Sequence, residues 1–355
     1  MKKILCAIAI ILAFICLLAS CNEKQSTEIH INEDGYWVIN GEKTNVKAQG
    51  EKGDDGADAT VVDENPQGLA FFLKDDGTYA VGIGYAKYLS KIEIPDTYKG
   101  KAVTEVGRFS DDTGNTILTE IIIPNSVILI GARAFKDCSN LMSVTIGNSV
   151  ITIGDSAFYN CANLTSVTIP NSVTIIEDSA FRDCSNLTSA TIPDSVTTIG
   201  NSVFNGCSNL TSVMIPDSVT TIGNYVFYDC SNLTSVTIPD SITTIGNSMF
   251  LGCTNLASVT IPDSVTIIGN CVFYNCSNLT SVVIPDSVIS IGYDVFYSCS
   301  NLTSVTFPNS NGWWCTRNEN ATSGTAISAS DLSIPSTAAE YLKYNYRSYY
   351  WYRTE

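Results

Sequence analysis

Cysteines at one fixed spacing are the residues of this sequence with the strongest capacity for chemistry. Eight of them recur at intervals of 23 residues: Cys138, Cys161, Cys184, Cys207, Cys230, Cys253, Cys276 and Cys299. Thiolates ligate zinc and act as nucleophiles, but both roles need suitable neighbouring groups. The only histidine of the chain is His30, far upstream of these cysteines. The sequence therefore excludes a cysteine or serine paired with an imidazole base in the same repeat, and a zinc site built on histidines.

The fixed spacing also indicates which architecture positions the cysteines. A typical repeat, from Cys207 to Asp229, has the sequence CSNLTSVMIPDSVTTIGNYVFYD. Tandem repeats of this length are typical of a solenoid, in which each repeat buries its apolar face against its neighbours. Successive strands of a parallel sheet lie about 4.8 Å apart, so a straight file of sulfurs cannot surround one zinc ion. We expect small buried thiols, while pairing of adjacent cysteines stays open on distance alone.

Each repeat carries the pattern of one buried strand followed by a tight turn. Leu210, Val213 and Ile215 are expected to point inward, and Pro216 ends the strand because proline cannot donate to a ladder. A phenylalanine closes each repeat, and the stacked repeats should place these rings in one continuous column: Phe135, Phe158, Phe181, Phe204, Phe227, Phe250, Phe273 and Phe296. The sequence thus predicts a narrow core that runs the length of the array.

Two polar columns accompany this core. An asparagine recurs two residues after each cysteine, and we expect these amides to be buried and to bond to the backbone of neighbouring repeats: Asn140, Asn163, Asn186, Asn209, Asn232, Asn255, Asn278 and Asn301. An aspartate follows the proline in five successive repeats: Asp194, Asp217, Asp240, Asp263 and Asp286. Aspartate favours such turns, so we expect solvated side chains; calcium bridging is the alternative.

The strand residues that alternate with the inward ones should face out from the sheet and form the candidate binding face. They are Ser143, Thr145, Ser166, Thr168, Ser189, Thr191, Ser212, Met214, Ser235, Thr237, Ser258, Thr260, Ser281, Val283, Ser304 and Thr306. This surface has small hydroxyls, two apolar side chains and no charge. Recognition of a partner and simple solubility of the sheet are equally good interpretations, because binding energy usually concentrates in Trp, Tyr and Arg.

Charge and composition narrow the class of protein. The 355 residues are 45% hydrophobic with a formal net charge of −16, which indicates a folded body. From Cys138 to Pro308 the only basic residue is Arg182. Nucleic-acid binding needs clustered Lys and Arg, so no nucleic-acid partner is expected. We expect no cofactor, no metal site and no catalytic residues.

The N-terminus has the pattern of a secretory signal. Lys2 and Lys3 precede an apolar run, and Leu18-Ala19-Ser20-Cys21 resembles a bacterial lipobox. We therefore predict a signal peptide over residues 1–20 and diacylation of Cys21, which would anchor the protein in a membrane. The alternative is an uncleaved membrane helix with an incidental cysteine.

The remaining chain divides into four segments. Residues 21–67 form a polar spacer with a small hairpin over Ile29–Ile31 and Tyr36–Ile39 and a short collagen-like glycine run. Residues 68–87 are predicted to be a β-hairpin cap, since Asp76-Gly77 lies between two apolar runs. Residues 88–310 form the array. Residues 311–355 form an aromatic C-terminal cap, with Ser336 capping a helix; recognition of a sugar or protein by its tyrosines is the alternative.

The repeat, Cys-x-x-Leu-x-x-Val-x-Ile-Pro followed by Ile-Gly-x-x-x-Phe, resembles the bacterial BspA-like leucine-rich repeat from about Leu89 to Pro308. We expect a β-dominated right-handed arc with a parallel concave sheet, and short strands or 3₁₀ turns on the convex side. The resemblance implies an extracellular surface protein that adheres to host or bacterial partners. It supplies no shared catalytic residues.

These expectations combine into a lipid-anchored, non-catalytic adhesion or recognition protein. It would lie outside the cytoplasm, on the outer membrane or cell surface, and bind an extracellular protein or glycan. One alternative is ice or mineral binding by the Ser/Thr array. Another is a hydrolase in the tail, with Glu319, Asp331 and Glu340 as candidate carboxylates.

Overall fold

The computed structural model describes residues 29–31, 36–39, 42–47, 67–110 and 114–354. The chain divides into two compact units, residues 1–62 and 63–355. In the first unit, β1 (Ile29–Ile31), β2 (Tyr36–Ile39) and β3 (Glu42–Lys47) form an antiparallel sheet. Strands β1 and β2 make the hairpin expected there. The predicted signal peptide, Cys21 and the glycine-rich run lie outside the described residues.

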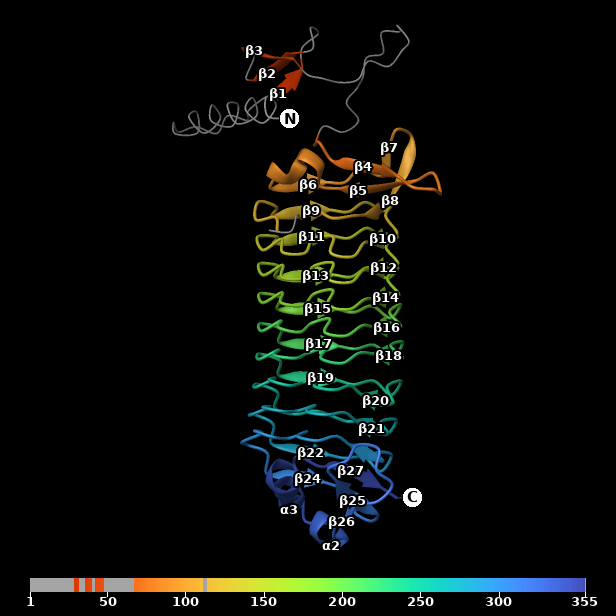
Figure 1. The fold of residues 1–355 in the computed structure, drawn as a ribbon, viewed down its shortest axis with the longest axis vertical. Helices are drawn as coiled ribbons and strands as arrows, with labels where there is room; N and C mark the ends of the chain where they lie inside the picture. Colours follow the sequence, from red (N-terminus) through yellow and green to blue (C-terminus); the bar gives the residue numbers. More distant parts are fainter. Residues whose placement is uncertain (1–28, 32–35, 40–41, 48–66, 111–113, 355) are drawn as a thin grey trace, which may run out of the picture. The chain divides into compact units, whose positions relative to one another are not determined.

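The second unit is a solenoid in which successive repeats stack and build two parallel ladders (Figure 1). The first ladder has three-residue strands: β6 (Lys91–Glu93), β9 (Glu120–Ile122), β11 (Ser143–Thr145), β13 (Ser166–Thr168), β15 (Ser189–Thr191), β17 (Ser212–Met214), β19 (Ser235–Thr237), β22 (Ser281–Val283) and β24 (Ser304–Thr306). The second has, after β8 (Lys101–Val106), two-residue strands: β10 (Leu129–Ile130), β12 (Thr152–Ile153), β14 (Ile175–Ile176), β16 (Thr198–Ile199), β18 (Thr221–Ile222), β20 (Thr244–Ile245), β21 (Ile267–Ile268) and β23 (Ser290–Ile291). The predicted leucine-rich-repeat solenoid, with a parallel sheet and a second line of short strands, is confirmed.

The sequence of each repeat explains where its first strand lies and stops. In β17, Val213 is buried between exposed Ser212 and Met214, as the two-residue period of a strand requires. Strand β17 pairs in register with β19 of the next repeat, so Val213 lies beside Val236. Pro216 follows and cannot donate to a ladder, while its carbonyl accepts a hydrogen bond from the N–H of Val219 at 3.0 Å.

A tight loop with two left-handed residues returns the chain after the second strand. Tyr225 has φ 59° and Asp229 has φ 55°, and Phe227 lies between them. Aspartate tolerates this conformation better than most residues. The side chain of Asp229 leans toward the next repeat, where Gly252 holds the same position with φ 77°. A Cβ there would collide with the Asp229 carboxylate as it is placed here, so glycine suits this position.

One repeat lacks its first strand. Residues 258–260 contribute only an isolated bridge between Thr237 and Thr260. This repeat has Ala257 where its neighbours have threonine, and in the preceding repeat the hydroxyl of Thr234 donates to the carbonyl of Thr211 at 3.1 Å. The N–H of Ala257 makes a long bond of 3.4 Å to the Thr234 carbonyl.

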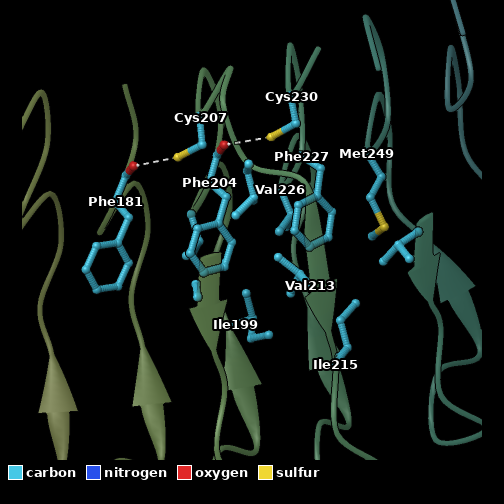
Figure 2. Packing of buried hydrophobic residues seen from close by; sticks show 14 of the residues in the cluster. Phe181, Ile199, Phe204, Cys207, Val213, Ile215, Val226, Phe227, Cys230 and Met249 are labelled. Carbon is cyan, nitrogen blue, oxygen red and sulfur yellow. Dashed lines mark hydrogen bonds between the residues drawn. The ribbon is translucent and has the colours of Figure 1, made fainter. Parts of the chain in front are cut away.

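The phenylalanine column is the core of the solenoid, as predicted. The rings from Phe135 to Phe296 are fully buried, and neighbouring rings stack with centroids 5.1–5.8 Å apart. Figure 2 shows the rings of Phe181, Phe204 and Phe227 in file. Phe109 extends the column into the degenerate first repeat, with its ring centroid 5.3 Å from that of Phe135. The column therefore links each repeat to both neighbours.

The asparagine column differs from the prediction. These side chains are exposed or half-buried rather than buried, and each amide bonds to the next amide instead of to the backbone. The Nδ2 of Asn163 donates to Oδ1 of Asn140 at 3.1 Å, and the pattern continues as far as Asn278. In-register stacking places identical amides side by side, so each donor meets the acceptor of its copy. The first amide, Asn140, alone donates to a backbone carbonyl, that of Thr116.

Residues 68–87 form the expected hairpin at the start of the solenoid. Strands β4 (Ala70–Leu73) and β5 (Tyr79–Gly82) pair antiparallel around Asp76-Gly77. Strand β5 then pairs in parallel with β8, so the hairpin covers the free edge of the second ladder. The 3₁₀ helix η1 (Gly84–Tyr88) and the short strand β7 (Thr97–Tyr98) complete this end.

The C-terminal segment covers the other end of the second ladder. Strand β27 (Tyr350–Arg353) pairs antiparallel with β23, and also with β25 (Trp313–Thr316), which pairs with β26 (Thr325–Ala326). The helices are α2 (Ala329–Leu332), α3 (Pro335–Glu340) and η2 (Tyr341–Asn345). The predicted cap at Ser336 is wrong. Ile334 precedes the helix, and Pro335 occupies its first position because proline has no N–H to leave unpaired there.

In the part of the chain that is described, no helix combines the length and the hydropathy that a membrane crossing requires.

Candidate binding face

The sixteen predicted face residues lie on the outward side of the first ladder. Serine and threonine at the two ends of each strand flank one inward valine or alanine, and most of them are exposed. The exceptions are Ser304 and Thr306, which are half-buried at the end of the array. Met214 and Val283 are exposed over 76% and 53% of their surface, so both offer apolar contact. The ladder thus brings together residues that are 23 positions apart in sequence.

The hydroxyls of this face differ from many hydroxyls in the columns beside it. In the columns beside it, hydroxyls donate to the carbonyl of the preceding repeat, as Thr211 Oγ1 does to Thr188 and Ser218 Oγ to Val196. Among the described residues, none of the fourteen face hydroxyls makes a hydrogen bond within the chain. They are free to donate to and accept from a ligand. The hydroxyls of the candidate face therefore have no hydrogen-bond partners within the described part of the chain.

The face carries no titratable group, so it cannot supply an acid, a base or a nucleophile activated by one. Shallow hollows lie elsewhere in the described residues. One is lined by Ile175, Glu177 and Asp178, where Glu177 replaces the glycine of other repeats, and another by Asp286 and Arg353. The face is suited to binding an extended surface rather than to enclosing a small substrate.

The cysteine column is a set of buried free thiols, as expected. All eight are fully buried. From Cys161 to Cys299, each Sγ donates to the carbonyl of the phenylalanine 26 residues earlier in the chain at 2.9–3.2 Å, and Figure 2 shows this for Cys207 with Phe181 and Cys230 with Phe204. Burial raises the pKa of Cys138, Cys184 and Cys299 from 9.0 to about 12. Neutral thiols are poor nucleophiles and poor metal ligands.

These thiols predict how stability depends on pH. Their pKa is raised in the folded state, so above pH 9 the unfolded chain binds fewer protons than the folded one, and the free energy of unfolding falls until the folded thiols ionise near pH 12. Each thiol contributes up to about 1.4 kcal/mol per pH unit in this window. Urea denaturation at pH 8 and pH 10.5 measures the loss. The double variant Cys207→Ala, Cys230→Ala should have a smaller slope; an unchanged slope would show that other groups cause it.

The aspartate column is exposed to solvent along its whole length. Within the described residues, no group of three His, Cys, Asp or Glu side chains is arranged to hold a metal ion. At a spacing of about 5 Å in water, repulsion between neighbouring carboxylates is only about 0.8 kcal/mol. The column is therefore stable without a bound cation.

Because the aspartates need no cation, we predict that millimolar calcium raises the melting temperature of the protein no more than magnesium does. A rise of several degrees specific to calcium, lost in Asp240→Asn, would overturn this.

The three carboxylates proposed for a hydrolase in the tail make separate contacts. Asp331 accepts a hydrogen bond from the hydroxyl of Tyr341 at 2.8 Å, and this bond raises the pKa of Tyr341. Glu319 accepts one from the hydroxyl of Tyr350 at 3.4 Å. Glu340 is exposed at the end of α3.

Sequence reasoning missed a second surface, on the loop that follows the second ladder. The residue after each phenylalanine is aromatic or basic in six of the eight repeats, and Asn205 and Leu251 are the exceptions: Lys136, Tyr159, Arg182, Asn205, Tyr228, Leu251, Tyr274 and Tyr297. Tyr225 lies beside Tyr228, with ring centroids 6.2 Å apart. Comparing the same position in every repeat would have found this column.

The profile of the BspA type Leucine rich repeat region matches residues 113–234 and 220–346, with six copies. These two overlapping matches span about two thirds of the chain. The chain belongs to the BspA-type leucine-rich repeat family. Members of such repeat families are typically binding scaffolds without enzymatic activity. This agrees with a BspA-type array whose exposed strand face carries hydroxyls and no titratable group.

Three solved structures are similar to this BspA-type chain. The T. pallidum leucine rich repeat protein is 26% identical, with 67% of this chain and 89% of that one covered and a TM-score of 0.46. A Bacteroides ovatus leucine-rich repeat protein is 27% identical, covering 68% and 87%, with a TM-score of 0.39. A leucine rich cell surface protein from Faecalibacterium prausnitzii is 26% identical, covering 68% and 87%, with a TM-score of 0.40. Among curated proteins no match was found.

Proposed function

We propose that this protein is a lipid-anchored, non-catalytic recognition module that binds an extracellular protein or glycan through its Ser/Thr face. The observation that carries the proposal is the set of exposed strand hydroxyls that make no hydrogen bond within the described chain. Many hydroxyls in the columns on either side, such as those of Thr211 and Ser218, tie one repeat to the next. The free hydroxyls therefore have no structural task that the fold needs.

The kind of partner follows from the chemistry of the face. A hydroxyl both donates and accepts, so a lattice of them suits the amides of a protein backbone or the hydroxyls of a glycan equally well. Met214 and Val283 add apolar contact within the same ladder. Single neutral hydrogen bonds contribute only about 0.5–1.5 kcal/mol, so useful affinity requires contact with several repeats at once. A long, regular partner surface fits this requirement best.

The test compares a variant that blocks the Ser/Thr face with a control variant that adds the same charges to the same repeats outside the face. In the full chain, Thr191→Arg with Thr237→Arg places long side chains on two alternate repeats of the face. The matched control, Thr197→Arg with Thr243→Arg, adds the same charge to exposed threonines of the same repeats outside the face. Binding is measured on arrays of extracellular matrix proteins and glycans.

We expect the face variant to lose at least about tenfold in affinity for whatever the wild type binds, and the control to lose less than about twofold. Equal loss in both variants, or none in either, would contradict a role for the face. Ice or mineral binding remains the competing proposal for this surface. It predicts thermal hysteresis, or adsorption to the mineral, that the face variant loses in the absence of any protein or glycan ligand.

Membrane anchoring forms the second part of the proposal and depends on Cys21. The context Leu18-Ala19-Ser20-Cys21 is that of a lipidation site. Two acyl chains would anchor the protein stably, at about 0.8 kcal/mol per buried methylene. We predict that Cys21→Ser abolishes sedimentation with membranes while the circular dichroism spectrum of the array is unchanged. Undiminished recovery of the variant in the membrane fraction would rule out lipid anchoring.

A further inference from the structure

The loop that carries the phenylalanines also carries a group of tyrosines, which we call the tyrosine edge: Tyr228, Tyr274 and Tyr297 directly after a phenylalanine, and Tyr225 and Tyr293 shortly before one. Tyr225 is 42% exposed and the other four are half-buried. The rings of Tyr274 and Tyr297 lie 5.0 Å apart. These side chains belong to another part of each repeat than the Ser/Thr face, so an inference about them does not depend on the function of that face.

At both ends of this column, cations of the chain itself lie on the tyrosine rings. Tyr159 is flanked by Lys136 Nζ at 5.3 Å and Arg182 Cζ at 5.7 Å from its ring centroid. At the other end, Arg347 Cζ lies 4.1 Å from the ring centroid of Tyr297. Both geometries are those of cation–π contacts. The tyrosine rings at the two ends of the column thus bind Lys and Arg cations of the chain itself.

The rings between these ends have no such cation. Among the described residues, no Lys or Arg lies over Tyr225, Tyr228 or Tyr274. None can come from nearby sequence, because residues 183–316 contain eight aspartates and no Lys, Arg, His or Glu. Asp229, next to Tyr228, makes no ion pair within the described chain, and its partial burial raises its pKa. Of the eight aspartates, Asp183, Asp229 and Asp294 lie in the same loops as the tyrosines. Carboxylates beside aromatic rings that have no cation of their own are complementary to a basic partner.

We propose that the tyrosine edge binds an arginine-rich segment of a partner protein. Arginine fits better than lysine because its planar guanidinium stacks on a ring and also reaches a carboxylate. Tyr228 and Tyr274 are two repeats apart, which is about 10 Å at the pitch of a parallel sheet. An extended peptide covers that distance in about three residues. A segment with arginine at every third position would therefore place successive guanidinium groups on the open rings.

The probe is a fluorescent peptide of four Arg-Ser-Gly triplets, with its Lys-Ser-Gly counterpart, titrated with the full chain in 150 mM salt. The test variant is Tyr225→Ser, Tyr228→Leu, Tyr274→Leu. Its residues come from neighbouring repeats, since Ser248 and Leu251 hold the same positions there, so the variant should fold. The control is Tyr85→Ser with Tyr344→Leu, which removes exposed tyrosines outside the edge.

We expect wild type to bind the arginine peptide more tightly than the lysine peptide. The test variant should bind it about tenfold more weakly and lose the preference for arginine, while the control should match wild type. Leu251→Tyr, which fills the gap in the column, should strengthen binding. An unchanged dissociation constant in the test variant, or an unchanged ratio between the two peptides, would overturn the proposal. Loss of a glycan-array signal in the test variant with peptide binding intact would assign the edge to sugars and also overturn it.

Discussion

Replacing Phe227 with alanine should lower the free energy of unfolding by about 3–5 kcal/mol, because it opens a cavity in the middle of the phenylalanine column. The ring is fully buried, with centroids 5.8 Å from that of Phe204 and 5.6 Å from that of Phe250. A solenoid is held together by contacts between neighbouring repeats, so the loss should extend to both adjoining repeats. Urea denaturation gives the total, and amide hydrogen exchange gives its distribution.

The control for this experiment is Phe72→Ala, since the Phe72 side chain is 60% exposed in the N-terminal hairpin. Its effect should stay within about 0.5 kcal/mol. Faster exchange of the Phe204 and Phe250 amides in Phe227→Ala, with little change at the ends of the array, would show the damage spreading between neighbours. A denaturation midpoint equal to that of wild type would mean that the column does not carry the stability of the array.

Trp351→Ala should be similarly costly, at about 3–5 kcal/mol, but its effect should stay at the C-terminal end. Trp351 is fully buried, stacks on Phe307 at 6.4 Å and donates from Nε1 to the Tyr346 carbonyl at 3.2 Å. Its backbone lies on β27, opposite Ile291 of β23. Removing the ring should release β27 and expose the last edge of the second ladder, which is a site for aggregation.

Hydrogen exchange distinguishes this local release from global unfolding. In Trp351→Ala, protection should fall in β23 and β24 and remain in β13. The matched control is Tyr344→Ala, because Tyr344 belongs to the same tyrosine-rich segment but is 56% exposed. Equal losses of protection in Trp351→Ala and Tyr344→Ala would contradict a capping role for the buried tryptophan. Intact protection of β23 in Trp351→Ala would contradict it as well.

Most of the fold could be predicted because a strand located in one repeat is expected at the same position in every other repeat. Proline after Ile215 and alternation around Val213 locate a strand, and the same pattern fixes eight further repeats. The buried phenylalanines follow from that period alone. The C-terminal segment could not be predicted in this way. Asp331–Pro335 resembles the strand motif, yet Asp331 lies in a helix whose first turn is capped by Ser328, because a segment beyond the array has no following repeat to pair with.

The sequence by itself determined the period, the inward residues, the strand ends and the buried thiols. These depend on hydrophobicity and on proline within a single repeat. The tertiary structure alone decided which polar groups are already bonded. It showed that asparagines pair with asparagines, that the hydroxyls of Thr188 and Thr211 bond to the preceding repeat, and that those of Thr168 and Thr191 remain free. It also showed which tyrosines are covered by cations and which are open. Such partners lie in the next repeat or at the end of the chain, so direction and register between repeats decide them, and no single repeat contains that information.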